Sequence, residues 1–380
     1  MSSPPYEKSY CKKLRSGSPI NRAATFQLRG APIMTSTKGY AAISAKEKLK
    51  PYAFERRDLR SDDVGFRIDF AGICHSDIHQ VREEWGEAIF PMVPGHEIVG
   101  TVTSIGKGVT RFKTGDRIGV GVFIDSCRNC KNCLNGLQQY CLEGVTGTYN
   151  GYERNTKQIA FGGYSNYFVI PESYAYRLPE NLDMAAMAPL LCAGITLYSP
   201  LKKWKVGPES SVAVAGLGGL GHMGVKFAAA LGAKVTVLSH SDSKENDAKA
   251  FGATDFVNTS KTDWHLGYRK KFDLILNTVS AQIDLEPYLS TLATDGSLVV
   301  IGLPGAPYSV SAGSLLDGRR SVAGSMIGGI PETQEMLDFC GAKNIVSEVE
   351  VINADYINKA YERTTSSDVR YRFVIDCSTF

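Results

Sequence analysis

The sequence lacks any uninterrupted apolar run of about 18 residues, so it predicts no transmembrane helix. Its most apolar window, residues 225–238, is broken by Lys226 and Lys234. The N-terminus lacks the apolar central region of a secretory signal. We find no internal repeat and no low-complexity segment. A membrane partner is therefore not expected.

Net charge is also scarce. The 380 residues hold 42 Lys and Arg against 39 Asp and Glu, a formal charge of +3. This gives no reason to expect a nucleic-acid partner, which normally requires clustered basic side chains. Hydrophobic residues at 43% and charged residues at 21% are ordinary for globular proteins and exclude a disordered, collagenous or coiled-coil chain. The length suggests two or three domains.

Positive charge is concentrated at the N-terminus. Residues 1–33 carry six Lys and Arg against one acid, Glu7, which leaves the rest of the chain faintly acidic. We expect a disordered basic extension on a cytoplasmic protein. A mitochondrial transit peptide, with Met34 opening the protein proper, is the alternative.

The pattern of apolar runs and turns along the chain changes twice. Before about residue 190, short apolar runs separated by Gly-containing turns (64–70, 98–105, 117–122, 167–170) predict an irregular β-rich domain. Near-continuous apolar runs then alternate with helical segments, which predicts an α/β domain with a doubly wound parallel sheet. Its strands are expected at 211–215, 234–238, 272–276 and 298–301, with a helix over 222–231. Near residue 330 a helix begins, and 371–375 is expected to form a closing strand.

A glycine-rich turn carries the first chemical signature. The run Gly216-Leu217-Gly218-Gly219-Leu220-Gly221 follows the strand over 211–215 and opens the helix over 222–231. In a dinucleotide-binding G-x-G-x-x-G turn, the first Gly makes the tight turn and the second lets backbone amides approach the pyrophosphate. The third packs helix on strand. We expect a dinucleotide site here, with an ordinary βα turn as the alternative.

The next strand indicates which dinucleotide. An acid at its end would favour NAD, because a carboxylate binds both ribose hydroxyls. Here the strand ends in Ser239, followed by His240, Ser241 and Lys244. Hydroxyls and an ammonium group suit the 2′-phosphate of NADP(H). Asp242 is the counter-evidence, although it lies three residues beyond the strand end.

Four of the nine cysteines lie within fifteen positions, at Cys127, Cys130, Cys133 and Cys141. Four thiolates without a histidine fit a closed structural zinc site. An iron–sulfur cluster is second, because the ferredoxin run has about three residues and not seven before its last cysteine. Disulfides are third, since nothing indicates an oxidising compartment. Cys11, Cys340 and Cys377 are expected to be free thiols.

Three further short segments contain candidate metal ligands, but their spacing alone does not assign them to one site. Cys74 lies in residues 72–77, His96 and Glu97 in 94–97, and Cys192 in 189–194. With the four-cysteine loop and G-L-G-G-L-G in the same order, they resemble the zinc-dependent medium-chain dehydrogenase/reductase (alcohol dehydrogenase) superfamily over about residues 40–375. The fit is closest to the cinnamyl-alcohol-dehydrogenase-like branch and its NADP-dependent broad-range aldehyde reductases.

The resemblance implies roles for particular residues. Cys74, His96 and Cys192 would bind a catalytic zinc. Glu97 would be a fourth ligand when no substrate is bound. Ser76 and His79, on one face of a helical turn, would relay a proton. The cofactor would lie along Ser76, Thr196, Thr278, Gly302, Ser325, Met326 and Ile327 as well as the glycine turn.

Three neighbouring features are less specific. His75, next to a ligand, is expected to pack and not to react. Trp85 is expected either in a wall of the substrate pocket or in the core. The polar loop over residues 149–161 is expected to face solvent, and so to say little about substrate.

These implications combine into one expectation. A GroES-like catalytic domain (34–192 and 330–380) would enclose an inserted NADP-binding Rossmann domain (193–329), with the active site between them. Two zinc ions per chain and NADP(H) would serve an alcohol dehydrogenase working mainly as an aldehyde reductase on small molecules, as a homodimer. An NAD-dependent zinc polyol or secondary-alcohol dehydrogenase would instead predict an acid at Ser239. A zinc-binding regulatory module, or a zinc-less relative without turnover, are the further alternatives.

Overall fold

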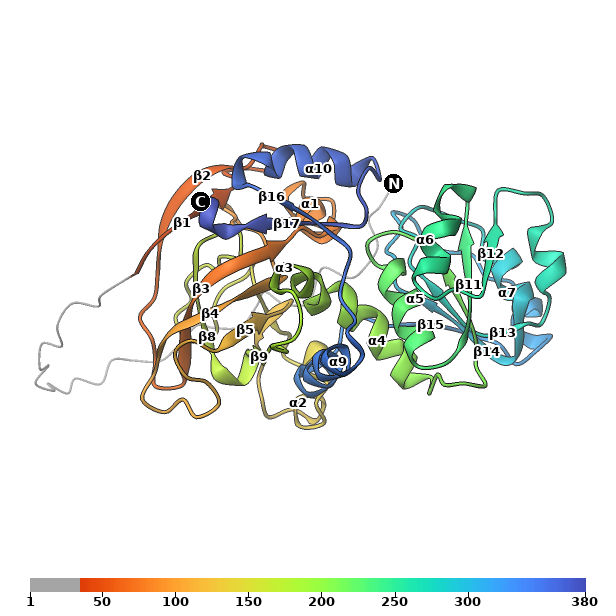
Figure 1. The fold of residues 1–380 in the computed structure, drawn as a ribbon, viewed down its shortest axis with the longest axis horizontal. Helices are drawn as coiled ribbons and strands as arrows, with labels where there is room; N and C mark the ends of the chain where they lie inside the picture. The colour runs from red at the N-terminus through yellow and green to blue at the C-terminus, as the bar shows by residue number, and fades with distance from the viewer. Residues whose placement is uncertain (1–34) are drawn as a thin grey trace, which may run out of the picture. The chain divides into compact units, whose positions relative to one another are not determined.

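The computed structural model describes residues 35–380, so the expected basic extension and Cys11 lie outside the described residues. Within the described part, the chain forms a seven-stranded sheet, a six-stranded sheet and two two-stranded sheets (Figure 1). The expected combination of an irregular β-rich domain and a doubly wound parallel sheet is confirmed.

The seven-stranded sheet joins strands from both ends of the chain. Its order is β16-β17-β3-β4-β5-β9, with β8 paired to β3. The strands are β3 (Asp63–Gly72), β4 (Ile98–Ile105), β5 (Arg117–Val120), β8 (Tyr167–Pro171), β9 (Tyr176–Arg177), β16 (Val349–Ile352) and β17 (Arg372–Asp376). The C-terminal strand β17 thus pairs with β3, directly before Cys74.

Alternation along these strands divides their side chains between two cores. Phe373 and Ile375 of β17 pack into the core of the β-rich part, whereas Val374 packs into a second core shared with the parallel sheet. Successive side chains of a strand point to opposite faces, so one short strand serves both cores.

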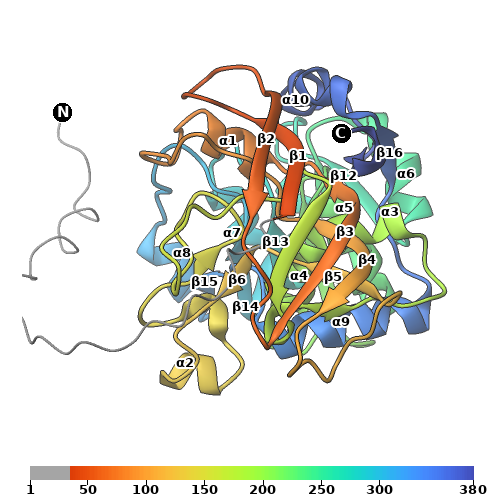
Figure 2. The same ribbon diagram turned by 90° about the vertical axis from the view of Figure 1, so that its left-hand side faces the viewer.

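A hairpin of β1 (Thr35–Ala41) and β2 (Lys50–Arg56) lies against this sheet (Figure 2), where Gly39 bridges to Ser165. A second small sheet joins β6 (Phe123–Asp125) and β7 (Thr146–Gly147). These two strands flank the four-cysteine segment, so that segment leaves and re-enters the fold at one place.

The six-stranded sheet is parallel throughout, in the order β12-β11-β10-β13-β14-β15. Its strands are β10 (Ser211–Ala215), β11 (Lys234–Ser239), β12 (Asp255–Asn258), β13 (Phe272–Asn277), β14 (Leu292–Val300) and β15 (Ser321–Gly324). Its helices are α5 (Gly221–Ala230), α6 (Glu245–Ala250), α7 (Glu286–Thr291) and α8 (Ala312–Leu316). Because the strand order reverses between β10 and β13, dinucleotide binding is expected at their carboxyl ends.

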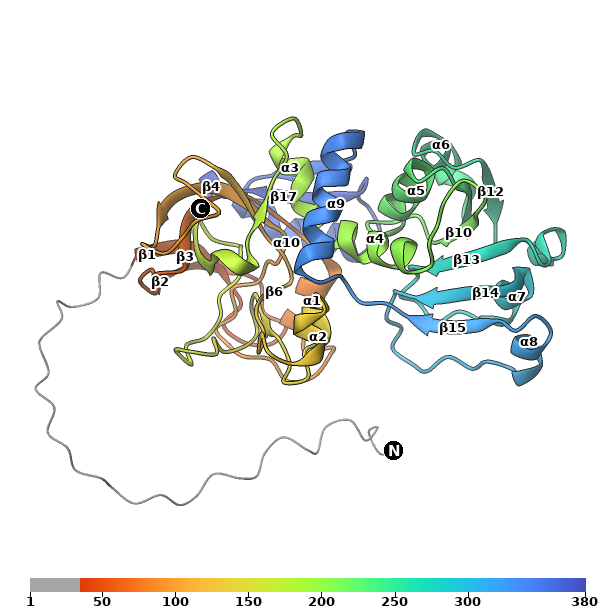
Figure 3. The ribbon, with the colours of Figure 1, turned by 90° about the horizontal axis from the view of Figure 1, so that it is seen from below.

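Helices connect the two sheets. α3 (Met184–Met187) leads to α4 (Ala193–Lys203), which packs on α5 and on α9 (Ile330–Lys343) (Figure 3). The hydroxyl of Tyr198 in α4 donates to Glu335 in α9 at 2.8 Å. α10 (Ile357–Thr365) precedes the last strand. The 3-10 turns are η1 (Gln138–Tyr140), η2 (Glu172–Tyr174), η3 (Ala188–Leu191), η4 (Asp242–Lys244), η5 (Trp264–Tyr268), η6 (Ala354–Tyr356) and η7 (Cys377–Thr379).

No single helix within residues 35–380 has the length and hydropathy to cross a membrane. Only two helical segments taken together, Met184–Leu191 and Ala193–Lys203, meet that requirement, and they are bent by 55° at their junction. Their apolar side chains belong to the core between the sheets.

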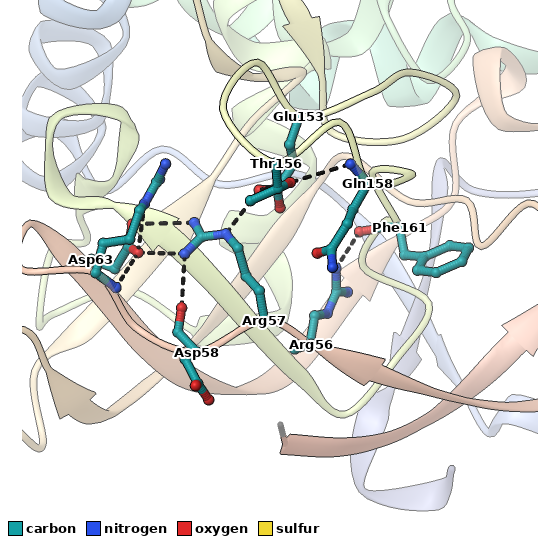
Figure 4. A network of polar contacts seen from close by, with 9 residues as sticks. Arg56, Arg57, Asp58, Asp63, Glu153, Thr156, Gln158 and Phe161 are labelled. Atoms are coloured by element: carbon teal, nitrogen blue, oxygen red, sulfur yellow. Dashed lines mark hydrogen bonds and ion pairs between the residues drawn. The ribbon is translucent and has the colours of Figure 1, made fainter. Parts of the chain in front are cut away.

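The loop over residues 149–161 faces solvent only in part, which corrects that expectation: Tyr152 and residues 155–158 are exposed, but Tyr149 and Ala160 are buried. Glu153 accepts a 2.8 Å bond from Nε of the half-buried Arg57, which also pairs with Asp63 (Figure 4). Arg56 donates to the carbonyl oxygen of Phe161 at 2.6 Å. The loop is therefore fixed by arginines that lie about a hundred residues earlier, a pairing that the loop's own polarity does not reveal.

Candidate active site and metal centres

Four of the expected catalytic residues meet in one buried cluster. Cys74 caps α1 (His75–Val81), His96 and Glu97 precede β4, and Cys192 precedes α4. One ligand atom from each lies within 4.8 Å of the others, and all four residues are buried. The two thiols are 3.9 Å apart. The fold thus joins residues that their spacing could not.

Asp77 orients this cluster, and the sequence analysis missed it. One carboxylate oxygen accepts hydrogen bonds from Nδ1 of His96 at 3.0 Å and from the amide of Gly95 at 3.1 Å. The other accepts from the amide of Cys74 at 2.9 Å and the hydroxyl of Tyr164 at 3.0 Å. Such a carboxylate leaves Nε2 of the histidine free for a metal. The available signal was an acid three residues after a helix N-cap.

Electrostatics in the cluster favour the thiolate form of Cys74. A hydrogen bond from Cys192 lowers the pKa of Cys74 despite burial, and the charge of Arg372 adds to that effect. Burial would lower the pKa of His96, but the neighbouring Asp77 carboxylate raises it well above its ordinary value. A proton on Nδ1 matches the bond to Asp77. Thiolate and imidazole nitrogen are ligands that zinc prefers.

Glu97 has one paired and one free carboxylate oxygen. Oε1 forms an ion pair with Arg372 of β17, another residue that the sequence analysis missed. Oε2 is buried without a hydrogen-bond partner among the described residues, and burial raises the pKa of Glu97 to about 7. Because an unpartnered buried oxygen is costly, a metal among Cys74, His96 and Cys192 would satisfy it. The residues present therefore fit a zinc ion.

The two expected relay residues lie on α1, but no hydrogen bond joins them among residues 35–380. The hydroxyl of Ser76 is 3.5 Å from Sγ of Cys74. His79 pairs through Nδ1 with Glu84 and stacks on Trp85, with ring centroids 4.8 Å apart. Trp85 is 43% exposed, so it is not a core residue. A proton passing between Ser76 and His79 needs a bridging hydroxyl or water.

His75 does not pack into the core, which corrects our expectation. It is exposed and lines a small cavity of about 70 Å³ together with Gly218, Gly219 and Arg372. Cys74 is the extended N-cap residue and is buried, whereas His75 is the first residue of α1 and is exposed. The residue therefore faces the glycine turn.

The glycine turn has the geometry that a dinucleotide site requires. Gly216 has φ +88°, a conformation that favours glycine. A Cβ on Gly218 would meet nothing within 4 Å, so its backbone is open to a ligand. A Cβ on Gly221 would overlap the carbonyl oxygen of Gly216, so the start of α5 can pack against the turn only with glycine there.

The expected 2′-phosphate residues lie at the end of β11 and just beyond it. Ser239 is buried, and its hydroxyl donates to the carbonyl oxygen of Ser241 at 3.2 Å. Lys244 donates from Nζ to the carbonyl oxygen of Leu217 at 2.8 Å, which holds the ammonium group over the glycine turn. His240 and Asp242 are exposed. Hydroxyls and an ammonium group are thus concentrated on this side of the turn.

The remaining cofactor candidates follow the other strands of the same edge. The hydroxyl of Thr278, after β13, donates to the carbonyl oxygen of Ala215 at 2.8 Å. Gly302 follows β14, and Ser325, Met326 and Ile327 follow β15. Thr196 lies in the first turn of α4, with its amide bonded to the carbonyl of Cys192 at 3.0 Å.

The four-cysteine segment, which we call the cysteine lobe (residues 127–142), forms a second cluster around α2 (Lys131–Leu134). Its four ligand atoms lie within 4.8 Å of one another. Backbone amides of Cys127, Cys130 and Leu142 point at cysteine sulfurs at 3.3–3.5 Å, and such bonds lower the pKa of Cys130 to about 6. This donor set fits a tetrahedral zinc. All described cysteines, including Cys340 and Cys377, are free thiols.

Comparisons with known proteins agree with this geometry. The model of the alcohol dehydrogenase GroES-like domain matches residues 60–180, and that of zinc-binding dehydrogenases matches 219–342. NADP-dependent alcohol dehydrogenase C 1 of Mycolicibacterium smegmatis is 54% identical over 347 residues, 91% of this chain and 99% of the relative. Aldehyde reductase YahK of Escherichia coli is 48% identical over 90% of this chain and 98% of its own. The crystal structure of CAD from Helicobacter pylori complexed with NADP(H) has a TM-score of 0.86 at 41% identity, covering 91% of this chain and 99% of that one.

Proposed function

The chain belongs to the zinc-binding alcohol dehydrogenase family, and on that premise we propose that it reduces aldehydes to primary alcohols with NADPH. One observation carries the proposal. Arg372 pairs with Glu97 in the metal cluster, while its Cδ lies 2.8 Å from the Cβ position of Gly219 in the glycine turn. The metal cluster and the dinucleotide turn are therefore adjacent, as hydride transfer between cofactor and substrate requires.

In this proposal the chain's own residues hold the reactants and move the proton. Cys74, His96 and Cys192 are the zinc ligands, with Glu97 as an exchangeable fourth. Bound there, zinc would polarise a carbonyl oxygen, and NADPH would supply the hydride. Ser76 would donate the proton from beside Cys74, and the partly exposed His79 would renew it from solvent through a bridging hydroxyl or water.

The coenzyme and the direction of reaction rest on two supports. Ser239, Ser241 and Lys244 offer hydroxyls and an ammonium group to a 2′-phosphate, and no carboxylate ends β11. Two relatives at 48% and 54% identity carry the names aldehyde reductase and NADP-dependent alcohol dehydrogenase. An NAD-dependent polyol dehydrogenase would instead have a carboxylate at the end of β11.

We propose that residues 193–329 form the nucleotide domain. Residues 34–192 and 330–380, on either side of it in the chain, form the catalytic domain. A homodimer through the nucleotide domains is a further proposal, supported by the open edge of β15 and the exposure of Leu316 (81%) and Val322 (37%). A cytoplasmic location stays a prediction, because the mitochondrial alternative rests on residues outside those that the structure describes.

The proposal is tested by metal analysis and by a panel of aliphatic and aromatic aldehydes assayed with NADPH and with NADH. We expect two zinc ions per chain and turnover that prefers NADPH. Cys74→Ser should abolish turnover and leave NADPH binding largely intact. Cys340→Ser is the matched control, since that buried thiol in α9 contacts Met336 and no ligand. A fully active Cys74→Ser variant, or a chain that turns over no aldehyde or alcohol, would contradict the proposal.

A further inference from the structure

The cysteine lobe contacts the backbone that leaves the parallel sheet after β15. The segment from Ser325 to Ile330, which we call the crossover segment, leads from the carboxyl end of β15 to α9. Two residues of η1 in the lobe hold it. The hydroxyl of Tyr140 accepts a hydrogen bond from the amide of Met326 at 3.2 Å. Oε1 of Gln138 accepts one from the amide of Ile330 at 3.0 Å.

Gln138 links this contact to the cysteine cluster itself. Its Nε2 donates to the carbonyl oxygen of Cys133 at 3.2 Å, and Cys133 is one of the four clustered cysteines. The same side chain thus bridges the cluster to Ile330 at the start of α9. Since Gly329 offers no side chain to cap that helix, Gln138 satisfies an amide that would otherwise lack a partner.

The crossover segment is also tightly confined. A Cβ on Gly329 would overlap the carbonyl oxygen of Gly136 in the lobe. On the other side, a Cβ on Gly328 would lie 2.6 Å from Cδ1 of Ile195 in α4. The segment is therefore wedged between the cysteine lobe and the helix that follows Cys192.

Between the two hydrogen bonds the backbone is strained. Ile327 has φ +41°, a left-handed conformation that β-branched residues rarely adopt. Such a conformation persists only where its surroundings fix it; the bond at Met326 lies one residue before Ile327, and the bond at Ile330 lies three residues after it. The lobe therefore determines the path of this backbone.

The position of the segment shows which part of the cofactor it would meet. The glycine turn follows β10 and the 2′-phosphate residues follow β11, so the adenosine half of NADPH belongs there. The nicotinamide half would then extend along the same edge toward β14 and β15, where the crossover segment begins. This assignment rests on the proposed function.

We infer that Gln138 and Tyr140 are positioning residues that hold the crossover segment for the nicotinamide half of NADPH, and so couple the cysteine lobe to cofactor affinity. Neither side chain needs to touch the cofactor. Their effect is carried by the backbone at Ile327, and it should be confined to the nicotinamide half.

The experiment compares two probes by direct binding titration: NADPH, which spans both halves, and 2′,5′-ADP, which occupies only the adenosine half. Tyr140→Phe removes one partly exposed hydroxyl, so the variant should fold and keep two zinc ions. It should bind NADPH about 3- to 10-fold more weakly, the range expected for one lost hydrogen bond, and bind 2′,5′-ADP as the parent does. Tyr152→Phe, which alters an exposed tyrosine of another loop, should change neither affinity.

Gln138 supplies a second, independent arm. Gln138→Met should weaken NADPH binding to a similar extent. Gln138→Glu keeps an acceptor for the Ile330 amide but sets a carboxylate oxygen against the carbonyl oxygen of Cys133, so it should restore the affinity only in part. Equal weakening of both probes, or unchanged NADPH binding in Tyr140→Phe and Gln138→Met, would overturn the inference. A parent chain that binds no NADPH would refute the proposed function instead.

Discussion

Asp77→Asn tests how the catalytic cluster is held in place. The Asp77 carboxylate is fully buried and accepts bonds from four donors, two on each oxygen. Asparagine keeps one oxygen and places an NH₂ group where the other was. The favoured orientation keeps the oxygen on His96 and Gly95, because the hydroxyl of Tyr164 can rotate to accept from the NH₂ group.

The loss of stability in Asp77→Asn then comes mainly from one hydrogen-bond donor. The amide of Cys74, now 2.9 Å from a nitrogen position, has lost its acceptor. A buried donor without a partner costs about 1–3 kcal/mol, and the remaining bonds lose their charge assistance. We expect the free energy of unfolding to fall by about 2–4 kcal/mol. Since His96 also loses an anionic partner, affinity for the catalytic zinc should drop by about 10- to 100-fold.

Denaturant unfolding and zinc retention against a graded chelator measure the two effects. Asp63→Asn is the matched control, because Asp63 is equally buried and bonded to Arg57 and Arg60, away from the cluster. It should lose stability without losing zinc affinity. If Asp77→Asn holds its catalytic zinc as tightly as the parent, or if Asp63→Asn releases it just as readily, Asp77 does not hold the zinc ligands in place.

Three other outcomes are expected. Ser239→Asp should lower the NADPH/NADH ratio of kcat/KM at least about tenfold, because a carboxylate and the 2′-phosphate a few Å apart repel each other strongly. The neutral variant Ser239→Asn should leave the ratio unchanged. An unchanged ratio in Ser239→Asp would refute the coenzyme assignment. Cys130→Ser should reduce zinc from two ions to one per chain and lower Tm, and retention of both ions would remove Cys130 as a ligand. Burial lowers the pKa of His222 to about 3 from 6.5, so acidification protonates the unfolded chain first. Stability should fall by about 2 kcal/mol from pH 6.5 to 5, and His222→Gln should flatten that slope in denaturation curves.

Several features could be predicted because their determinants are local. The run Ser211–Ala215 is apolar after its first residue since helices cover both faces of its sheet, and it forms β10 with those bounds. The glycine turn and the cysteine lobe also depend on short spacings within one loop. In both, the residue types restrict the backbone conformation or the bound ligand so strongly that their spacing in the chain is enough to predict the feature.

Other features could not be read in this way, because the partners lie far apart in the chain. The contact of Arg372 with Glu97 joins positions 275 residues apart. Arg57 and Glu153 meet across 96 residues, which is why a polar loop proved to be anchored. His75 was misjudged because its direction depends on how α1 packs, and that is a property of the assembled domain.

By itself, the sequence determined which elements form and which side chains can bind metal or dinucleotide, since those depend on periodicity and residue chemistry. Only the tertiary structure decided how these pieces combine. It brought Cys74 and Cys192, 118 residues apart, to 3.9 Å. It gave His96 its carboxylate and set the crossover segment against the cysteine lobe. These outcomes follow from packing between distant segments, where burial makes each polar group find a partner that no local pattern specifies.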